Sequence, residues 1–228
     1  MAVNPETIHV TQPAGALGMA RAARRAGYRQ RMSRLPSLRR DELGPDGQEV
    51  WDSVVGTRGS ELLNNEGGLT GPFNAFLHAP DVGRHLSTLG ATVRFGTSLE
   101  RRLSEVAIIT VGARWKAEFE WWAHARMARR HGVPDAVVDA IGRGEDPPFA
   151  ADDERAVYEV ARQLTGTGKL SQAAYDGACR HLGAAGMVEL VTTCGYYTTI
   201  SFLLNAFEVP LPPGAAPQWD AGAGPAAT

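Results

Sequence analysis

The apolar segment that runs from Thr97 to His131 constrains the fold more than any other part of this chain. Its first half, TSLERRLSEVAIITVGARW, has apolar residues at helical spacing, and Thr97 followed by Glu100 has the pattern of a capping box. Its second half, KAEFEWWAHARMARRHG, predicts another helix that stops at Gly132, with Pro134 just beyond. We therefore expect two consecutive helices, the first capped by Thr97.

Three ionisable residues stand inside this apolar segment. Glu105 shares a helix face with Ile108 and Ile109, so its carboxylate is expected to point inward. Glu120 and His124 lie one turn apart on the second helix, within hydrogen-bonding reach. A Glu–His pair at this spacing is also common on helix surfaces and in satisfied cores, and that interpretation stays open beside a catalytic one.

The chemistry of such a cluster is proton transfer. A buried carboxylate tends to hold its proton, whereas a carboxylate beside an imidazole favours the imidazolium, so the pair can exchange protons near neutral pH. Perturbed ionisable groups of this kind concentrate at functional sites. The candidate catalytic residues are therefore His124 as acid or base, Glu120 to orient it, and Glu105 as a second proton carrier or positioning group.

The run RRLSEVAIITVGARWKAEFEWWAHARMARRHG resembles the carboxymuconolactone decarboxylase family, whose superfamily also contains the alkylhydroperoxidase D-type reductases. In the reductase branch a Glu precedes a Cys-x-x-Cys-x-x-x-His motif. With His124 placed on the motif histidine, Glu105 falls on the glutamate, and Ala117 and Glu120 fall on the two cysteines. The flanking sequences extend the resemblance over residues 35–213, and the missing thiols place the chain nearer the decarboxylase-like branch.

The resemblance implies a function, a cofactor requirement and an assembly. It implies a cofactor-free lyase or isomerase that acts on a small carboxylated, conjugated or lactone substrate, with decarboxylation as the first expectation. No cofactor and no metal are expected. Family members form trimers or hexamers, so a homo-oligomer is expected. Two alternatives remain: a non-catalytic small-molecule-binding oligomer of the same fold, and a peroxidase-type antioxidant activity.

Several residues around the motif are candidates for binding substrate. Trp121 lies on the stripe of His124 and is expected to line a pocket, although core packing is its ordinary role. An anionic substrate needs a cation, and Arg102, Arg114 and Arg94 lie near the motif. Arg102 can instead form a salt bridge with Glu105, three residues further along the helix, and Arg114 can bind the carbonyls that end its helix.

A glycine-rich stretch, NNEGGLTGP, precedes a short predicted helix over Phe73–His78. It lacks the Gly-Lys-Ser/Thr ending of a P-loop, so it is expected to shape a pocket mouth instead. Asn74 and His78 lie one turn apart on the short helix and are secondary substrate-binding candidates. Capping of the helix before Pro80 is the ordinary alternative for His78.

The two cysteines argue against dithiol chemistry. A dithiol reductase needs a low-pKa thiolate with a resolving partner, usually in Cys-x-x-Cys. Cys179 and Cys194 are instead fifteen residues apart in an apolar region, where a free cysteine behaves as a small hydrophobe. Their spacing fits neither a disulfide framework nor a zinc site. Two free cysteines are consistent with a protein of the reducing cytoplasm.

Composition and the spacing of helix-breaking residues predict an all-α, single-domain helical bundle. The 228 residues are 43% hydrophobic with a net charge of −2, enough for one sizeable core, and no segment has the ~20 uninterrupted apolar residues of a membrane span. Val, Ile and Thr never alternate with polar residues for long enough to predict a sheet. Further helices are expected over 46–55, 81–95, 134–141, 153–164, 172–182 and 187–207, with Ser171 as a cap.

The two ends of the chain differ from this domain, which is expected to cover residues 35–213. Residues 1–34 form an arginine-rich arm, expected to be partly ordered and to pack on an oligomer partner. Nucleic-acid binding is not expected, because no recognition motif or aromatic interleaving accompanies the charge. Residues 214–228 are rich in Pro, Gly and Ala and are expected to be a flexible tail.

Overall fold

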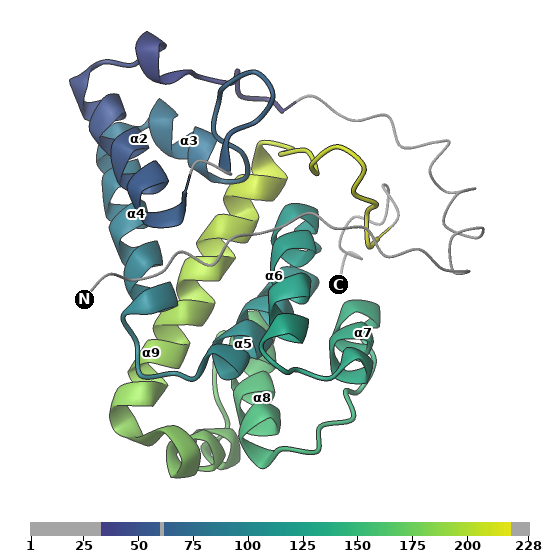
Figure 1. The fold of residues 1–228 in the computed structure, drawn as a ribbon. Helices are drawn as coiled ribbons and strands as arrows, with labels where there is room; N and C mark the ends of the chain where they lie inside the picture. Colours follow the sequence, from purple (N-terminus) through teal and green to yellow (C-terminus); the bar gives the residue numbers. More distant parts are fainter. Residues whose placement is uncertain (1–32, 60–61, 220–228) are drawn as a thin grey trace. The chain divides into compact units, whose positions relative to one another are not determined.

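The computed structural model describes residues 33–59 and 62–219, and these residues form helices with a single isolated bridge, between Leu63 and Leu69 (Figure 1). The elements in chain order are η1 (Arg40–Glu42), α2 (Pro45–Arg58), α3 (Phe73–His78), α4 (Pro80–Phe95), α5 (Arg101–Arg114), α6 (Glu118–Arg130), α7 (Asp135–Arg143), α8 (Asp152–Thr167) and α9 (Gln172–Ala206). The expectation of an all-α fold is therefore confirmed. Nearly all of the arginine-rich arm, residues 1–32, lies outside the described residues.

The described residues divide into two compact units. The first comprises the residues up to Thr88 together with Phe207–Ala216, and the second comprises Leu89–Ala206 together with the residues from Pro217 onward. The division falls inside α4, so this helix contributes residues to both units.

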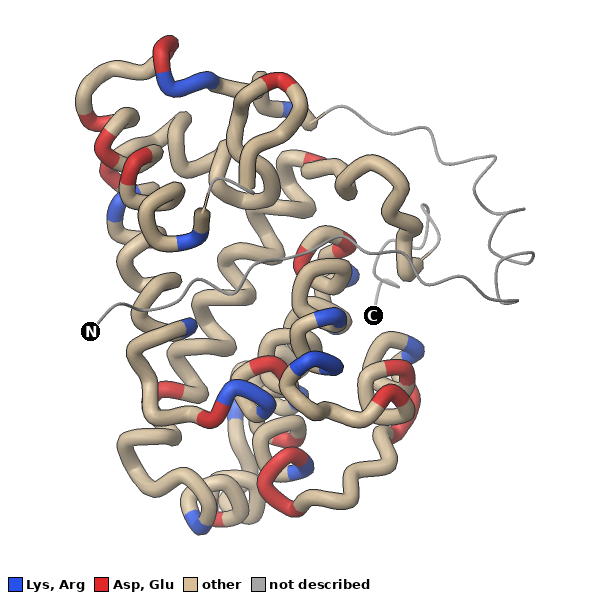
Figure 2. Tube along the Cα trace, viewed as in Figure 1, with Lys and Arg blue, Asp and Glu red and all other residues tan. Residues whose placement is uncertain are grey.

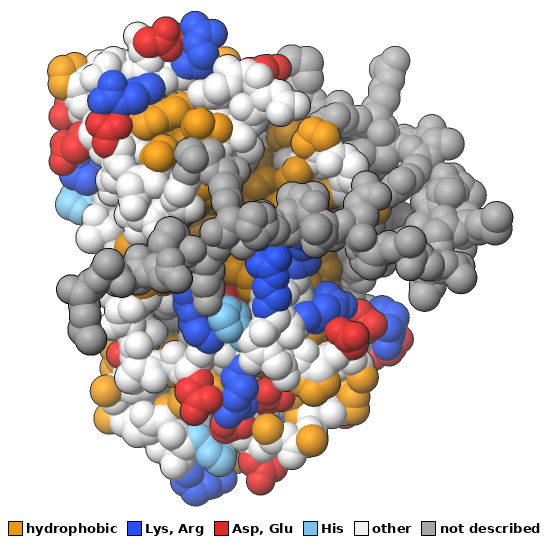
Figure 3. All heavy atoms as spheres, viewed as in Figure 1, with side chains coloured by type: hydrophobic (Ala, Val, Ile, Leu, Met, Phe, Trp, Pro, Cys, Tyr) orange, Lys and Arg blue, Asp and Glu red, His pale blue; other side chains and the backbone are white. Residues whose placement is uncertain are grey.

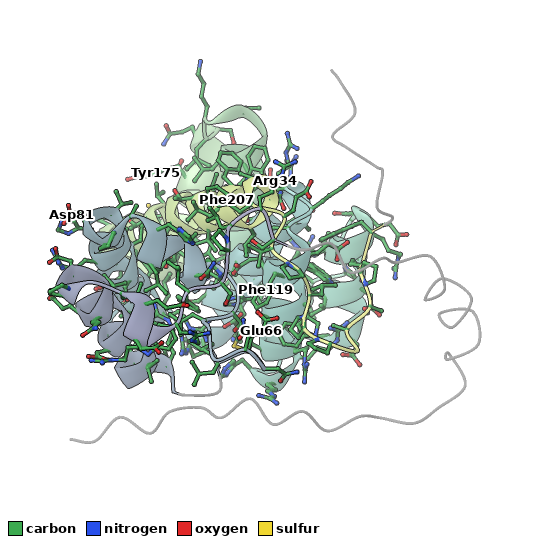
Figure 4. The ribbon with its side chains drawn as sticks, turned by 90° about the horizontal axis from the view of Figure 1, so that it is seen from above. Arg34, Glu66, Asp81, Phe119, Tyr175 and Phe207 are labelled. Carbon is green, nitrogen blue, oxygen red and sulfur yellow. The ribbon has the colours of Figure 1, made fainter. Side chains whose placement is uncertain are left out.

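The first unit packs α2 against α3. Trp51 is buried on α2, and Phe76 is buried on α3. Gly83 at the start of α4 allows a close approach, because a Cβ atom at this position would lie 2.4 Å from the carbonyl oxygen of Phe76. In the same unit the backbone N–H of Arg34 donates to the carbonyl of Phe207 over 2.8 Å (Figure 4).

The second unit is built around α5, which packs against α6, α7, α8 and α9. Every residue from Leu103 to Gly112 is buried, so α5 is covered on all its faces. A helix in this position has no solvent side on which to place polar residues, and this explains why most of its buried residues are apolar. Glu105 is thus a charged residue inside the most enclosed helix of the unit.

The first motif helix begins later than the sequence suggested. Thr97 was expected to cap it, but α5 begins at Arg101, with Glu100 in the N-cap position and no side-chain cap. The reason is a tertiary contact: the backbone N–H and hydroxyl of Ser98 both donate to the carboxylate of Glu189 on α9, at 3.0 and 2.7 Å. These bonds hold the segment before α5 in a non-helical conformation.

The remaining helix predictions agree closely with the structure. The helix α6 ends at Arg130, just before Gly132, which has a positive φ of 91°. The long helix α9 contains a break at Gly183, with φ 65° and ψ −177°, and this break separates the two helices that the sequence predicted there. Ser171 caps the first of them, with its hydroxyl oxygen accepting the N–H of Ala174 over 3.2 Å.

The two ends of α6 carry opposite charges. The acidic residues Glu118 and Glu120 lie in its first turn, and the basic residues Arg129 and Arg130 lie in its last turn. Figure 2 shows acidic positions at one end of this helix and basic positions toward the other. This arrangement is favourable for the helix dipole. No helix in the described part of the chain is long and apolar enough to cross a membrane.

Candidate active site

The imidazole of His124 on α6 lies between two carboxylates. Its Nδ1 is 2.7 Å from Oε2 of Glu105 on α5, and its Nε2 is 3.0 Å from Oε1 of Glu120, one turn earlier on α6. Relative exposure is 0% for Glu105, 4% for Glu120 and 6% for His124. The structure therefore brings together the three ionisable residues that the sequence singled out.

A fourth ionisable group, Arg94 near the end of α4, joins this cluster. Its Nη1 lies 3.3 Å from Nε2 of His124 and 3.9 Å from Oε1 of Glu105. Its Nη2 points at the sulfur of Met127 over 3.1 Å. Arg94 was one of three arginines considered from the sequence, and it is the one that the fold places beside the histidine.

Tyr197 on α9 completes the surroundings of the imidazole. Its ring meets that of His124 edge-to-face, with centroids 5.1 Å apart, and it is buried. No pattern in the sequence singled out this residue. The only signal available was the pair Tyr196–Tyr197 inside the apolar stretch of α9, and a tyrosine pair in a buried helix is ordinary core material.

Two carboxylate oxygens in this cluster have no hydrogen-bond partner among the described residues. They are Oε1 of Glu105 and Oε1 of Glu120, and the latter is near Nε2 of His124 without the alignment of a regular hydrogen bond. Buried carboxylate oxygens almost always have a partner, because leaving one unsatisfied costs about 1–3 kcal/mol or more. Acceptor capacity therefore remains in the cluster for a further donor.

Electrostatics favour the charged form of the histidine. Burial lowers the pKa of His124, but Glu105 and Glu120 outweigh that effect, and the pKa is raised above its ordinary value. Burial likewise opposes the ionisation of Glu105, yet His124 and Arg94 lower its pKa overall. The pKa of Arg94 is raised, because Tyr197 and the two carboxylates outweigh its desolvation, so it stays protonated.

The other two arginines considered as anion-binding groups have different partners. Arg102 forms ion pairs with Asp153 and Glu154 at the start of α8, and not with Glu105, the salt-bridge partner that helical spacing suggested. Arg114 is exposed at the opposite end of α5 from Glu105, and its guanidinium lies 4.9 Å from the ring centroid of Trp115.

Trp121, expected to line a pocket, is buried on the His124 helix with 6% exposure. Its ring lies 5.4 Å from that of Trp219, and Gly142 packs tightly beside it. The tail was expected to be flexible, but Gln218 and Trp219 make specific contacts in the second unit. Residues 220–228 lie outside the described residues, and the flexibility of the tail stays a prediction.

Asn74 and His78 lie in the first unit, where both contact the chain just before η1. Asn74 accepts the N–H of Leu38 over 3.0 Å and donates to the carbonyl of Pro36 over 3.0 Å. Nε2 of His78 is 3.0 Å from the same carbonyl. Their role in substrate binding stays a prediction.

The cysteines are both free. Cys194 is buried, and burial raises the pKa of its thiol to about 12, which keeps it protonated at neutral pH. Cys179 is partly exposed. Among the described residues no group of three or more His, Cys, Asp or Glu side chains is arranged to hold a metal ion.

Comparisons with known proteins identify the fold. No family model and no curated protein sequence matches this chain. Solved structures do match. An uncharacterised peroxidase-related protein with an alkylhydroperoxidase AhpD core, from Ralstonia eutropha JMP134, superposes with a TM-score of 0.64 at 14% identity, over 80% of this chain and 94% of that one.

Two further structures agree. A protein of unknown function from Agrobacterium tumefaciens, described as a putative antioxidant defence protein AhpD, gives a TM-score of 0.56 at 16% identity, over 63% of this chain and 99% of its own. The debrominase Bmp8 gives 0.61 at 15% identity, over 78% of this chain and 91% of its own. The decarboxylase-like branch inferred from the sequence stays a prediction. The chain has the all-helical fold of the alkylhydroperoxidase D-like proteins.

Proposed function

We propose that this chain is an enzyme in which His124 exchanges a proton with a small substrate, as a cofactor-free lyase or isomerase. The observation that carries this proposal is the position of Nε2 of His124, which faces the carboxylate of Glu120 at 3.0 Å and the guanidinium of Arg94 at 3.3 Å. With a proton, Nε2 forms an ion pair with this carboxylate. Without one, it can accept from the guanidinium, so both protonation states have a partner.

The formal charges of the cluster favour an acid over a base as the resting form. Two carboxylates and one guanidinium carry a net charge of −1, and an imidazolium at His124 neutralises it. Uncompensated charge is costly in a buried site, so the neutral combination is preferred. This agrees with the raised pKa of His124, which favours the protonated form that can act as a proton donor.

Decarboxylation of a conjugated substrate uses such a donor directly. The bond between the carboxylate carbon and the substrate breaks, carbon dioxide leaves, and the electron pair moves into the conjugated carbonyl as a dienolate. The Nε2 proton of His124 then adds to the dienolate carbon, and the histidine regains a proton from solvent. In an isomerisation, His124 would add the same proton to a substrate carbon, and the substrate would lose a proton from a different carbon. The two reactions therefore need the same proton donor.

Arg94 supplies the cation that an anionic substrate or dienolate requires. Its Nη2 contacts the sulfur of Met127, and a thioether is a weak acceptor. A substrate oxygen would be a stronger partner for the same donor, because charge-assisted hydrogen bonds to oxygen are about twice as strong as neutral ones. We therefore assign substrate orientation to Arg94, with Trp121 as an apolar wall.

Two other functions compete with this one. A peroxidase-type activity is favoured by the names of the structural neighbours, and a cysteine-to-alanine variant of the debrominase Bmp8 was crystallised with 2,3,4-tribromopyrrole. In this chain, however, Ala117 and Glu120 stand where the reductase branch has its cysteines, and Cys194 is a buried, protonated thiol. The second competitor is a non-catalytic small-molecule-binding oligomer.

The test uses a γ-carboxylated unsaturated lactone as probe, in deuterated water. The proposal expects release of carbon dioxide and incorporation of deuterium at carbon, both lost in His124→Gln by at least ~100-fold, the usual contribution of a positioned acid or base. His85→Gln is the control, because His85 is exposed on α4, and it should retain full activity.

Other outcomes separate the alternatives. A probe that binds tightly without being consumed supports the non-catalytic function. Peroxide consumption that persists in a Cys179→Ser, Cys194→Ser double variant supports a peroxidase-type activity that does not need the thiols. Full turnover by His124→Gln rules out this histidine as the acid.

A further inference from the structure

Residues Gln218 and Trp219 bind the second unit through three hydrogen bonds. The backbone N–H groups of Gln218 and Trp219 donate to the two carboxylate oxygens of Glu118, over 2.7 and 2.8 Å. The indole Nε1–H of Trp219 donates to the carbonyl of Gly142 over 2.9 Å. A short segment near the C-terminus is thus held by the first residue of α6 and the end of α7.

The indole of Trp219 also has an aromatic neighbour. Its ring meets that of Trp121 at a centroid distance of 5.4 Å and an interplanar angle of 61°, an edge-to-face arrangement. Such aromatic pairs contribute beyond their buried area. Trp121 belongs to α6, where it stands immediately after Glu120 and three residues before His124. The contact with Trp219 is therefore made by the same helix that carries two residues of the His124 cluster.

Gly142 leaves the room that this arrangement needs. A Cβ atom at position 142 would lie 2.5 Å from Cζ2 of Trp121 and 3.0 Å from Nε2 of Gln218. Any side chain there would displace the Trp121 ring or the amide of Gln218. The site for Trp219 is therefore formed by three unlike groups: the Glu118 carboxylate, the Gly142 carbonyl and the Trp121 ring.

We propose that these three groups form an indole-binding site for the chain's own Trp219, and that its occupation positions α6 and the His124 cluster. The carboxylate selects a chain segment that offers two successive N–H groups, and the carbonyl selects a ring that carries an N–H donor. The helix α6 has no side-chain cap at its N-terminus, so the tail supplies a constraint that its own sequence lacks.

The first test measures whether the two indoles are in edge-to-face contact in solution. Indoles this close couple electronically and give a paired positive and negative band in the far-ultraviolet circular dichroism spectrum. Trp219→Phe and Trp121→Phe should each abolish that pair of bands. The control is Trp122→Phe, because Trp122 packs against Phe119 and outside this site, and it should keep the bands. Bands that survive in Trp219→Phe overturn the proposal.

The second test uses free indole as the probe. In Trp219→Ala the site is empty, and indole should bind, as apolar cavities created by truncation bind aromatic molecules. The wild type should bind none at this site. Benzothiophene has a similar shape without the N–H donor, and it should bind about fivefold more weakly, the loss expected for one neutral hydrogen bond. Equal affinities for the two molecules, or no binding of indole, overturn the assignment.

The third test concerns positioning, and it does not depend on turnover. The titration midpoint of His124, followed by NMR, should fall in Trp219→Ala because a shift of α6 moves the imidazole away from Glu105 on α5, and added indole should restore it. An unchanged midpoint in Trp219→Ala overturns the positioning role. Trp219→Phe keeps a ring in the site, and its midpoint should lie between those of the wild type and Trp219→Ala; a midpoint below that of Trp219→Ala overturns the role as well.

Discussion

Nδ1 of His124 lies 2.7 Å from Oε2 of Glu105, although nineteen residues separate them in the sequence. The contact joins two consecutive helices across their buried interface, and α5 and α6 form one of the larger helix contacts of the second unit. Because Glu105 is fully buried, the ion pair has little solvent screening. This relationship determines how the protein should respond to pH and to substitution.

Stability should decline on the alkaline side of His124's ordinary pKa of 6.5. The folded-state pKa of His124 is raised, so its contribution to the free energy of unfolding is fully present below 6.5 and is lost as pH rises through the folded-state value. Urea denaturation at a series of pH values measures this. The alkaline loss should be smaller in His124→Gln and unchanged in His85→Gln, and an identical pH profile in all three proteins would contradict the assignment.

Substitutions of the two charged neighbours should shift the histidine in opposite directions. Glu105→Gln removes the carboxylate that raises the pKa of His124, so the NMR titration midpoint should fall. Arg94→Leu removes a cation 3.3 Å from the ring, and the midpoint should rise. Glu145→Gln serves as the control, because it removes a carboxylate that pairs with Arg143 on the surface. Shifts of the same sign in the first two variants would refute this account of the cluster.

A single methyl group should destabilise the first unit. In Gly83→Ala the new Cβ would meet the carbonyl oxygen of Phe76 at 2.4 Å, so α3 and the start of α4 must separate. We expect a loss of about 1–3 kcal/mol in the free energy of unfolding, the usual cost of overpacking. Gly56→Ala on α2 is the matched control, because nothing lies within 4 Å of its Cβ position.

The control substitution Gly56→Ala should change the free energy of unfolding in the opposite direction. Alanine favours the helix over glycine by about 0.5–1 kcal/mol, so Gly56→Ala should stabilise the protein slightly. Thermal or chemical denaturation of both variants measures the pair. Equal effects of the two substitutions would show that the contact with Phe76 does not require glycine.

An exposed apolar face of α9 is where the expected homo-oligomer would form. Val188, Val191 and Phe202 are 68%, 41% and 50% exposed, and their spacing places them on one side of the helix. Figure 3 shows hydrophobic side chains at several places on the face that it draws. Light scattering at micromolar concentration should give a trimer or hexamer, and Val188→Glu should lower the mass. A monomeric wild type would contradict the expectation.

The positions of several helices could be predicted from the sequence because capping and helix-breaking residues mark their ends. Gly132 and Pro134 mark the end of α6, Ser171 caps the start of α9, and Gly183 breaks it. The exception is instructive: Thr97 has the local signature of a cap, but Ser98 bonds to Glu189, and a distant residue thereby delays the start of α5. Local signals identify where helices can begin, and tertiary contacts choose among the possibilities.

For the candidate site, the sequence determined the pairing of Glu120 with His124 and the inward direction of Glu105, because helical periodicity alone fixes which residues share a face. Only the tertiary structure decided that Arg94 and Tyr197 join them and that Trp219 packs against Trp121. These contacts connect segments far apart along the chain. No local spacing rule reaches across such separations, so only the three-dimensional contacts of these residues determine which side chains meet.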